Sequence, residues 1–310
     1  MSGDKGGLDL RRARRLAGEV LEALLGARPR RLTPMGGGLT NFVFGARHGG
    51  EELILRMSAD PAKGKDYLKE QWAIARAAEA GVPVPEVLEV GSAPVPYMVA
   101  RRVEGTDATR HPDRRRLLQE LGGHARRVHG VETSGFGDTF DWSENRLSRK
   151  ESWRDYLERE FRGEQRLSVL EAQGMLTRPA LKTLRRTLDE IGGWDARPAL
   201  NHGDLRLKNV IVGPRGGIAA VIDWEFCTSN AAPYWDLSLA LHDLSVDGKE
   251  AFLEGYGMAP EAMAEVAPAL RVFNVLNYAG VVERAARERD EGKLAWLRAR
   301  LYGALDLHAF

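Results

Sequence analysis

A group of polar residues surrounds two short apolar runs in the stretch Asn201–Phe226. His202 and Asp204 precede the first run, Asn209 follows Asp204 by five positions, and Asp223 follows the second run. This spacing is typical of a kinase catalytic loop, in which an aspartate orients the acceptor hydroxyl and an asparagine binds magnesium. The ordinary alternative is a β-hairpin whose Asp, Asn and Gly residues simply favour turns.

Four polar positions at these offsets favour the kinase interpretation over the turn interpretation. The runs VIVG and AAVID are predicted to pair as buried strands and so to form a rigid mount for the polar side chains. Asn209 and Asp223 would then bind Mg²⁺, a hard cation that takes a few oxygen ligands besides phosphate oxygens. Arg206, two positions after Asp204, is predicted to stabilise charge on the transferred phosphoryl group. The alternative for Arg206 is an ordinary surface cation.

Two features upstream agree in order with this interpretation. A glycine-rich turn, GGGLTNFVF, runs from Gly36 to Phe44 and would let backbone N–H groups approach phosphate oxygens. Arg56, on the third expected strand, would hold the α- and β-phosphates, with Glu70 of the following helix as its ion-pair partner. The alternatives are an ordinary glycine-rich hairpin and a surface salt bridge of little energetic value.

The elements that must position these residues form a sheet-rich first part and a helical remainder. An amphipathic helix with a wet arginine face is expected near the N-terminus. It is followed by three strands, a helix and two strands, expected at 30–34, 41–47, 51–57, 64–81, 86–91 and 97–103. The predicted fold class is therefore α+β with two lobes. Residues 1–102 would form an N-lobe with a small antiparallel β-sheet and one covering helix, and residues 103–310 a larger, mainly helical C-lobe.

Composition sets the broad class of the protein. The chain has 310 residues, 43% of them hydrophobic and 29% charged, which is typical of a soluble globular protein. A net charge of +1 gives no general attraction to nucleic acid or membranes. The single cysteine, Cys227, cannot form an internal disulfide, which fits a reducing cytoplasm. No stretch is typical of a signal peptide or a membrane span, so we expect a cytoplasmic protein. We also expect a monomer or a weak dimer.

Over nearly its whole length the chain resembles the aminoglycoside phosphotransferase family, small-molecule kinases with a protein-kinase-like bilobal fold. The catalytic segment NHGDLRLKN and the loop GGGLTNFVF carry the resemblance to the superfamily. Within the family, the chain is most similar to hygromycin-B phosphotransferases. The stretches that indicate this branch are ELILRMS, PVPEVLEVG, ARRVEG, TSGFG, WRDYL and AVIDWEF.

The resemblance implies a role for each matching position. Asp204 would be the catalytic aspartate, with Asn209 and Asp223 as metal ligands and Arg56 with Glu70 as the phosphate-binding pair. The donor, ATP or GTP, would bind the glycine loop and a hinge. The loop residues are Gly36, Gly37, Gly38, Thr40 and Asn41, and the hinge residues are Ala100, Arg101, Arg102 and Val103. Many relatives carry lysine at the position of Arg56, but arginine also stays charged and grips phosphate in a fork.

Two further residues would support the loop. The resemblance gives His202 the task of bracing the loop backbone. Asp236 would anchor the same loop from the buried start of a helix.

The predicted reaction is transfer of the γ-phosphate to a hydroxyl of an aminoglycoside-type antibiotic. A cationic, polyhydroxylated acceptor would favour an acidic wall, although each candidate acid is also explained as a solvated helix charge. The candidates are Glu225, Asp243, Asp247, Glu250 and Glu254. Because these acids form no dense cluster in the sequence, a macrolide, a peptide antibiotic, a sugar or an amino alcohol stays open.

Two other classes of protein fit the sequence less well than a small-molecule kinase. The short stretch between Asp223 and Asp236 leaves little room for the activation segment of a protein kinase. Retention of Asp204, Asn209 and Asp223 argues against a pseudokinase scaffold, which needs no base.

Overall fold

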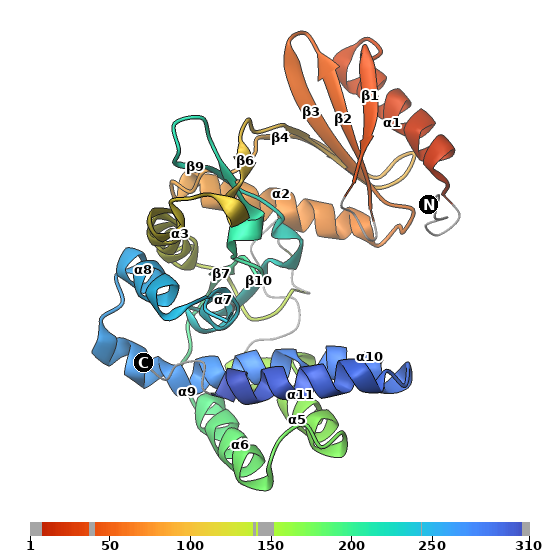
Figure 1. Cartoon of the computed structure of the whole chain (residues 1–310). Helices are drawn as coiled ribbons and strands as arrows, with labels where there is room; N and C mark the ends of the chain where they lie inside the picture. Colours follow the sequence, from red (N-terminus) through yellow and green to blue (C-terminus); the bar gives the residue numbers. More distant parts are fainter. Residues whose placement is uncertain (1–7, 37–40, 139–140, 142–151, 243, 306–310) are drawn as a thin grey trace. The chain divides into compact units, whose positions relative to one another are not determined.

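The computed structural model describes residues 8–36, 41–138, 141, 152–242 and 244–305. The chain divides into two compact units (Figure 1). Unit 1 comprises Met1–Thr106 and Val210–Glu225, and unit 2 comprises Asp107–Asn209 and Phe226–Phe310. The second crossing between units falls directly after Asn209, so the segment that carries Asp223 belongs to unit 1. The expected lobe boundary between residues 102 and 103 stays a prediction.

Unit 1 is built on a five-stranded antiparallel sheet, as the sequence predicts. Its strands lie in the order β1-β2-β3-β5-β4, and Phe44 of β2 pairs with Leu55 of β3, which in turn pairs with Val99 of β5. The strands are β1 (Arg31–Met35), β2 (Phe42–His48), β3 (Glu51–Met57), β4 (Val87–Gly91) and β5 (Tyr97–Arg101).

Helices cover both faces of this sheet. Helix α1 (Leu10–Leu25) lies beside β1 and β2 in Figure 1. Its apolar residues pack against alternate side chains of β2 and β3. The side chain of Asp9 accepts a hydrogen bond from the Arg12 amide at 2.7 Å, which caps the helix start. The arginines of α1 lie on its exposed side, as expected. Helix α2 (Lys63–Glu79) meets the other face, because Arg56 points away from Leu55 and contacts Glu70.

The second part of unit 1 is a hairpin made from distant sequence. Strands β8 (Val210–Val212) and β9 (Ile218–Val221) pair antiparallel, as predicted for the two apolar runs. The short strand β6 (Thr106–Asp107) extends them to a sheet in the order β6-β8-β9. The Val221 amide donates to the Pro83 carbonyl at 2.8 Å, which ties the hairpin to the chain before β4.

Unit 2 contains two helices that pack through glycines. Helix α3 (Arg114–His129) lies against α8 (Val246–Tyr256). A Cβ at Gly122 would lie 2.0 Å from the Phe252 carbonyl oxygen, and one at Gly255 would lie 1.7 Å from the Gln119 oxygen. The two backbones therefore approach more closely than any side chain would allow.

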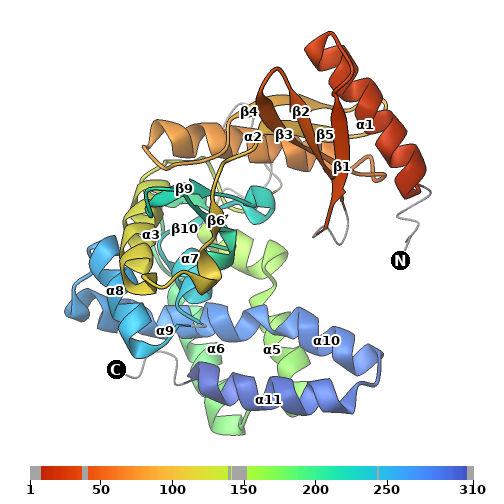
Figure 2. The ribbon, with the colours of Figure 1, turned by 45° about the horizontal axis from the view of Figure 1, so that its top comes forward.

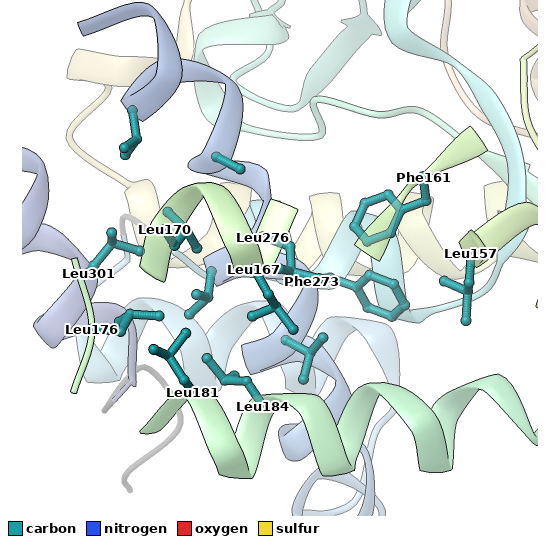
Figure 3. Packing of buried hydrophobic residues seen from close by; sticks show 14 of the residues in the cluster. Leu157, Phe161, Leu167, Leu170, Leu176, Leu181, Leu184, Phe273, Leu276 and Leu301 are labelled. Carbon is teal, nitrogen blue, oxygen red and sulfur yellow. The ribbon is translucent and has the colours of Figure 1, made fainter. Parts of the chain in front are cut away.

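Five further helices of unit 2 enclose a second hydrophobic core. Leu170, Phe273, Leu276 and Leu301, which come from α5, α9 and α11, are among its fully buried members (Figure 3). Figure 2 shows α9, α10 and α11 as neighbours along one side of the unit. The helices are α5 (Gly163–Ala172), α6 (Arg178–Gly192), α9 (Pro260–Asn277), α10 (Ala279–Arg287) and α11 (Glu291–Leu305).

The segment 152–174 lies in the part of the chain expected to be mainly helical, but its helix is interrupted. A turn of α-helix, α4 (Trp153–Asp155), continues into a π-helical turn (Tyr156–Glu160), and Arg162 then takes a left-handed φ of 53°. The Phe161 amide donates to the Tyr156 carbonyl at 2.9 Å. This five-residue step brings the two rings to 6.2 Å between centroids and turns both into the core, so tertiary packing overrides the helical pattern.

A short two-stranded sheet in unit 2 has no counterpart in the sequence prediction. Strand β7 (Pro198–Asn201) pairs antiparallel with β10 (Thr228–Ala231). Helix α7 (Tyr234–Ala240) follows β10, and single 3-10 turns lie at Ala108–Arg110, Leu207–Asn209 and Trp224–Phe226. In the part of the chain that the structure describes, none of the helices combines the length and the apolar character needed to cross a membrane.

Candidate functional site

The loop that carries Asp204 begins where β7 ends. Gly203 has a left-handed φ of 82°, and a Cβ there would lie 2.1 Å from the Phe226 carbonyl oxygen. Both facts require glycine. The sharp turn at Gly203 places Asp204 directly after the end of the strand.

Asp236, at the start of α7, holds the backbone of this loop. Its carboxylate accepts hydrogen bonds from the amides of His202 and Gly203, both at 2.7 Å, and lies 3.1 Å from His129 Nε2. Burial alone would raise the pKa of Asp236, but the hydrogen bond and charge of His129, with the contribution of His202, hold it below the usual value. The predicted structural role of Asp236 is confirmed by these contacts. His202 braces the loop backbone as expected, because its Nδ1 accepts a hydrogen bond from the Asp204 amide at 3.2 Å.

Asp204 is buried and is held by three neighbours of its own loop. Arg206 Nε lies 2.5 Å from Oδ1, and Arg206 Nη2 contacts the same oxygen. Lys208 Nζ lies 2.5 Å from Oδ2, to which Asn209 Nδ2 also donates at 3.0 Å. The structure thus brings Asp204, Arg206 and Asn209 together. Lys208 was missed in the sequence, where it reads as one exposed lysine among several.

Asn209 fits the role of a cation ligand. Its amide nitrogen donates to the backbone oxygen of Asp204 at 2.8 Å and to the Asp204 carboxylate. Because the nitrogen donates to Asp204, the side-chain oxygen Oδ1 is the atom that would bind a hard cation.

Asp223 lies at the end of the β8–β9 hairpin in a special backbone conformation. Its φ is 68°, a left-handed value that is uncommon for a residue other than glycine. The next residue, Trp224, is fully buried and donates from Nε1 to the Val221 carbonyl at 3.0 Å. Trp224 therefore fixes the turn after the strand and with it the position of the Asp223 carboxylate.

The Arg56–Glu70 pair is formed as predicted. Arg56 Nη1 lies 2.6 Å from Glu70 Oε2, and Nη2 lies 3.3 Å from Oε1. Only 1% of the Glu70 side chain is exposed, so this is no surface salt bridge. Burial raises the pKa of Glu70, and the charge of Arg56 opposes that rise.

Further charges surround this pair within unit 1. Glu225 lies 3.7 Å from Arg56 Nη2 and 3.9 Å from Lys63 Nζ. Burial disfavours the charged form of Arg56, but Glu70, and to a lesser extent Asp223, raise its pKa on balance. Arg56 therefore stays a cation and lies within the field of the Asp223 carboxylate.

The expected nucleotide loop is only partly described. Gly36 follows β1 and is exposed, and Asn41 precedes β2 and is buried. Gly37, Gly38 and Thr40 lie outside the described residues.

The expected hinge begins at the end of β5. Ala100 and Arg101 belong to the strand, and Arg102 and Val103 follow it. Arg101 Nε pairs with Glu86 at 2.6 Å, and Arg102 Nη1 pairs with Glu52 at 2.9 Å. Of the four hinge residues, Arg102 lines a pocket on the sheet.

That pocket, of about 360 Å³, lies over β1, β2 and β3. Gly45 forms part of its wall, and a Cβ there would meet Met35 Sδ at 3.1 Å. The absence of a side chain at Gly45 therefore helps to leave this face open. The lining residues are Arg31, Thr33, Met35, Gly45, Ala46, Arg47, Glu52, Leu53 and Arg102.

The acids expected to line the acceptor site belong to both units. Glu225 belongs to unit 1, where it lies near Arg56 and Lys63. Glu254 of α8 pairs with Arg115 of α3 at 3.1 Å. Asp247 and Glu250 lie on α8, which packs on α3, and Asp243 lies outside the described residues. Across those parts of the chain that are described, no three His, Cys, Asp or Glu side chains form a metal-binding group.

Comparison with known proteins identifies the family. The model of a phosphotransferase enzyme family matches residues 31–273, which is most of the chain. The chain belongs to this family and is a phosphotransferase, as the sequence predicts. A search of the curated proteins gives no match.

Solved structures show the same fold. A thermostable mutant of aminoglycoside phosphotransferase APH(4)-Ia, in its apo form, has a TM-score of 0.67 at 20% identity, with 93% of this chain and 98% of that chain covered. Macrolide 2'-phosphotransferase MphH from Brachybacterium faecium has a TM-score of 0.64 at 19% identity, covering 95% and 97%. The GDP and kanamycin complex of APH(2")-IIIa has a TM-score of 0.63 at 15% identity, covering 94% and 98%. The kinase-like α+β fold expected from the sequence is thereby confirmed.

Proposed function

We propose that this protein transfers the γ-phosphate of ATP or GTP to a hydroxyl group of a small molecule, with an aminoglycoside-type antibiotic as the first candidate acceptor. The observation that carries the proposal is the loop after β7, in which a buried carboxylate is fixed between two cations and an asparagine. Family membership supports the reaction type. The fold neighbours include APH(4)-Ia in ternary complex with ADP and hygromycin B.

Asp204 acts as the positioning base in this proposal. The acceptor oxygen attacks the γ-phosphorus while its proton passes to the Asp204 carboxylate. The bond from the γ-phosphorus to the bridging oxygen breaks, and its electron pair leaves with the nucleoside diphosphate. Anchoring of the loop backbone by Asp236 keeps the carboxylate in place, which is the main protein contribution in phosphoryl transfer.

Cationic residues neutralise the phosphates. Arg56, held by Glu70, binds the α- and β-phosphates, and Arg206 stabilises charge on the transferred group. Asn209 and Asp223 supply oxygen ligands to Mg²⁺. When bound, Mg²⁺ neutralises negative charge on the phosphate oxygens.

The donor binds along the glycine loop and the hinge. Gly36, Gly37, Gly38, Thr40 and Asn41 offer backbone N–H groups to the phosphates. Ala100, Arg101, Arg102 and Val103 bind the purine, and the pocket beside Arg102 supports this placement.

A macrolide is the second candidate acceptor. MphH, whose fold this chain shares at a TM-score of 0.64, is a macrolide 2'-phosphotransferase. Glu254, one of the candidate acids for a cationic acceptor, is paired with Arg115, which keeps a less cationic acceptor open.

An acceptor screen tests the proposal. Purified protein with MgATP or MgGTP is offered hygromycin B, kanamycin, a macrolide and simple sugars, and products are examined by mass spectrometry for one added phosphoryl group. We expect one compound class to be phosphorylated and the Asp204→Asn variant to leave it unmodified. Nucleotide turnover that no acceptor stimulates, with no phosphorylated product, would contradict the proposal. A second readout is the growth, in the presence of the antibiotic, of a susceptible host that expresses the wild-type chain or the variant in its cytoplasm.

A further inference from the structure

We propose that Lys208 is a positioning residue that occupies Asp204 Oδ2 in the free enzyme and gives this oxygen up to the acceptor hydroxyl. The inference rests on the proposed function, because it takes Asp204 as the base. It assigns a task to a residue that the kinase pattern of the loop does not include.

Local structure directs Lys208 toward Asp204. Leu205 and Leu207 are buried, with 1% and 6% exposed, and so anchor the loop. The residues between and after them, Arg206 and Lys208, are more exposed, at 36% and 49% of their side chains, and both contact the Asp204 carboxylate. The 3-10 turn Leu207–Asn209 brings Lys208, four positions after Asp204, onto the carboxylate.

The carboxylate has no acceptor site to spare in this arrangement. An ionised carboxylate offers about four lone-pair sites, two on each oxygen. Arg206 fills those of Oδ1 with Nε and Nη2. Lys208 Nζ and Asn209 Nδ2 fill those of Oδ2. A hydroxyl that is to donate its proton here must therefore displace one of these donors.

Lys208 is the donor that can leave most easily. Asn209 is buried and is also tied to the Asp204 backbone oxygen at 2.8 Å. Arg206 makes two contacts from one rigid guanidinium. Lys208 makes one contact from a flexible stem, and 49% of its side chain is exposed, so opening it costs little.

The released side chain has a place to go. Lys208 and Arg206 line a pocket of about 200 Å³ together with Thr109, Arg114 and apolar residues such as Leu205 and Leu207. The described residues that line it carry no carboxylate. As Asp204 gains the hydroxyl proton during the transfer, it loses its negative charge, and with it the attraction that would draw Lys208 back.

The test separates kcat from KM for the acceptor that the wild-type enzyme phosphorylates. In Lys208→Met the acceptor no longer has to displace a cation, so its KM falls about threefold to tenfold. The carboxylate loses one of its holders, so kcat falls about tenfold. Lys208→Arg restores a donor to Oδ2 and recovers both constants. Lys182→Met, on the exposed side of α6, is the matched control and leaves both unchanged.

The affinity for Mg-nucleotide, measured by fluorescence titration, is a readout that does not depend on turnover. We expect Lys208→Met to keep the wild-type affinity. The inference is overturned if kcat and acceptor KM equal those of Lys182→Met, if the acceptor KM rises, or if nucleotide affinity falls instead. A wild-type enzyme that phosphorylates no acceptor contradicts the proposed function itself, whereas an active wild type with an unaffected Lys208→Met contradicts only this inference.

Discussion

Glu70 of unit 1 and Asp204 of unit 2 are both buried carboxylates, but their charges are compensated in different ways. In unit 1, Glu70 and its partner Arg56 are both largely buried, with 1% and 18% of their side chains exposed. In unit 2, the Asp204 side chain is 6% exposed, while those of its partners Arg206 and Lys208 are 36% and 49% exposed. A pair buried on both sides is permanent, because opening it would leave a charge without water. A buried acid with solvated cations can exchange its partners during turnover.

The largest expected effect comes from Arg56→Met, which leaves Glu70 buried without its cation. We expect a loss of about 3–5 kcal/mol in the free energy of unfolding at pH 8. Without Arg56 the pKa of Glu70 in the folded state rises further above its unfolded value. When a carboxyl group has a higher pKa in the folded than in the unfolded state, stability is lost as the pH increases. The stability loss caused by Arg56→Met is therefore smaller at pH 5 than at pH 8. Urea unfolding at both pH values measures it.

Two variants control this experiment and test the comparison itself. Arg56→Met combined with Glu70→Leu removes both charges and is expected to recover most of the stability. Lys208→Met removes a half-exposed cation and is expected to cost less than about 1 kcal/mol. Equal losses in Arg56→Met and Lys208→Met would contradict the distinction between the two units.

Gly203→Ala is expected to be next in size, at about 3 kcal/mol. The new Cβ would meet the Phe226 carbonyl oxygen at 2.1 Å in a left-handed conformation, so steric overlap adds to backbone strain. Gly174→Ala is the matched control, since Gly174 also has a left-handed φ of 58° but nothing within 4 Å of its Cβ. Thermal unfolding compares the two. A loss no larger than that of Gly174→Ala would mean that the loop can shift, and that Asp204 is less firmly held than we infer.

A smaller effect on stability is expected from His124, which lies on α3 in unit 2. Burial, with the charge of Arg127, lowers its pKa from 6.5 to about 4. Between pH 6.5 and about pH 4, His124 is therefore protonated in the unfolded chain but neutral in the folded chain. Stability falls as the pH drops through this range. From pH 7 to pH 5 this corresponds to about 2 kcal/mol.

His124→Gln is expected to remove that part of the pH dependence, and His48→Gln in unit 1 to leave it unchanged. Urea unfolding at pH 7 and pH 5 measures the difference. If His124→Gln kept the wild-type slope, another group would be responsible for the acid sensitivity.

The sequence predicts the parts of this molecule whose signals are local. Alternation and glycines gave the strands of unit 1 to within a few residues, and the order of strand, helix and catalytic loop predicted the contact of Arg56 with Glu70. The strands β7 and β10 were missed because each has four residues and forms only by pairing across a long separation. The interruption at Arg162 was missed because it depends on aromatic packing in the core.

The site was predictable in its residues but not in its charge balance. The spacing of Asp204 and Asn209 matches the pattern of a kinase catalytic loop, so both residues could be predicted from the sequence. The contact of Lys208 with Asp204 depends on a 3-10 turn and on the burial of Leu205 and Leu207, which no periodicity in the sequence reports.

The most direct test of the central claim is single-turnover phosphoryl transfer by Asp204→Asn with saturating Mg-nucleotide and acceptor. Asparagine keeps the size and one oxygen of aspartate but cannot act as a base. The account predicts a rate about 10²–10⁴-fold lower than that of the wild type, with unchanged affinity for Mg-nucleotide. A variant that binds nucleotide normally and transfers phosphate at the wild-type rate would contradict the account.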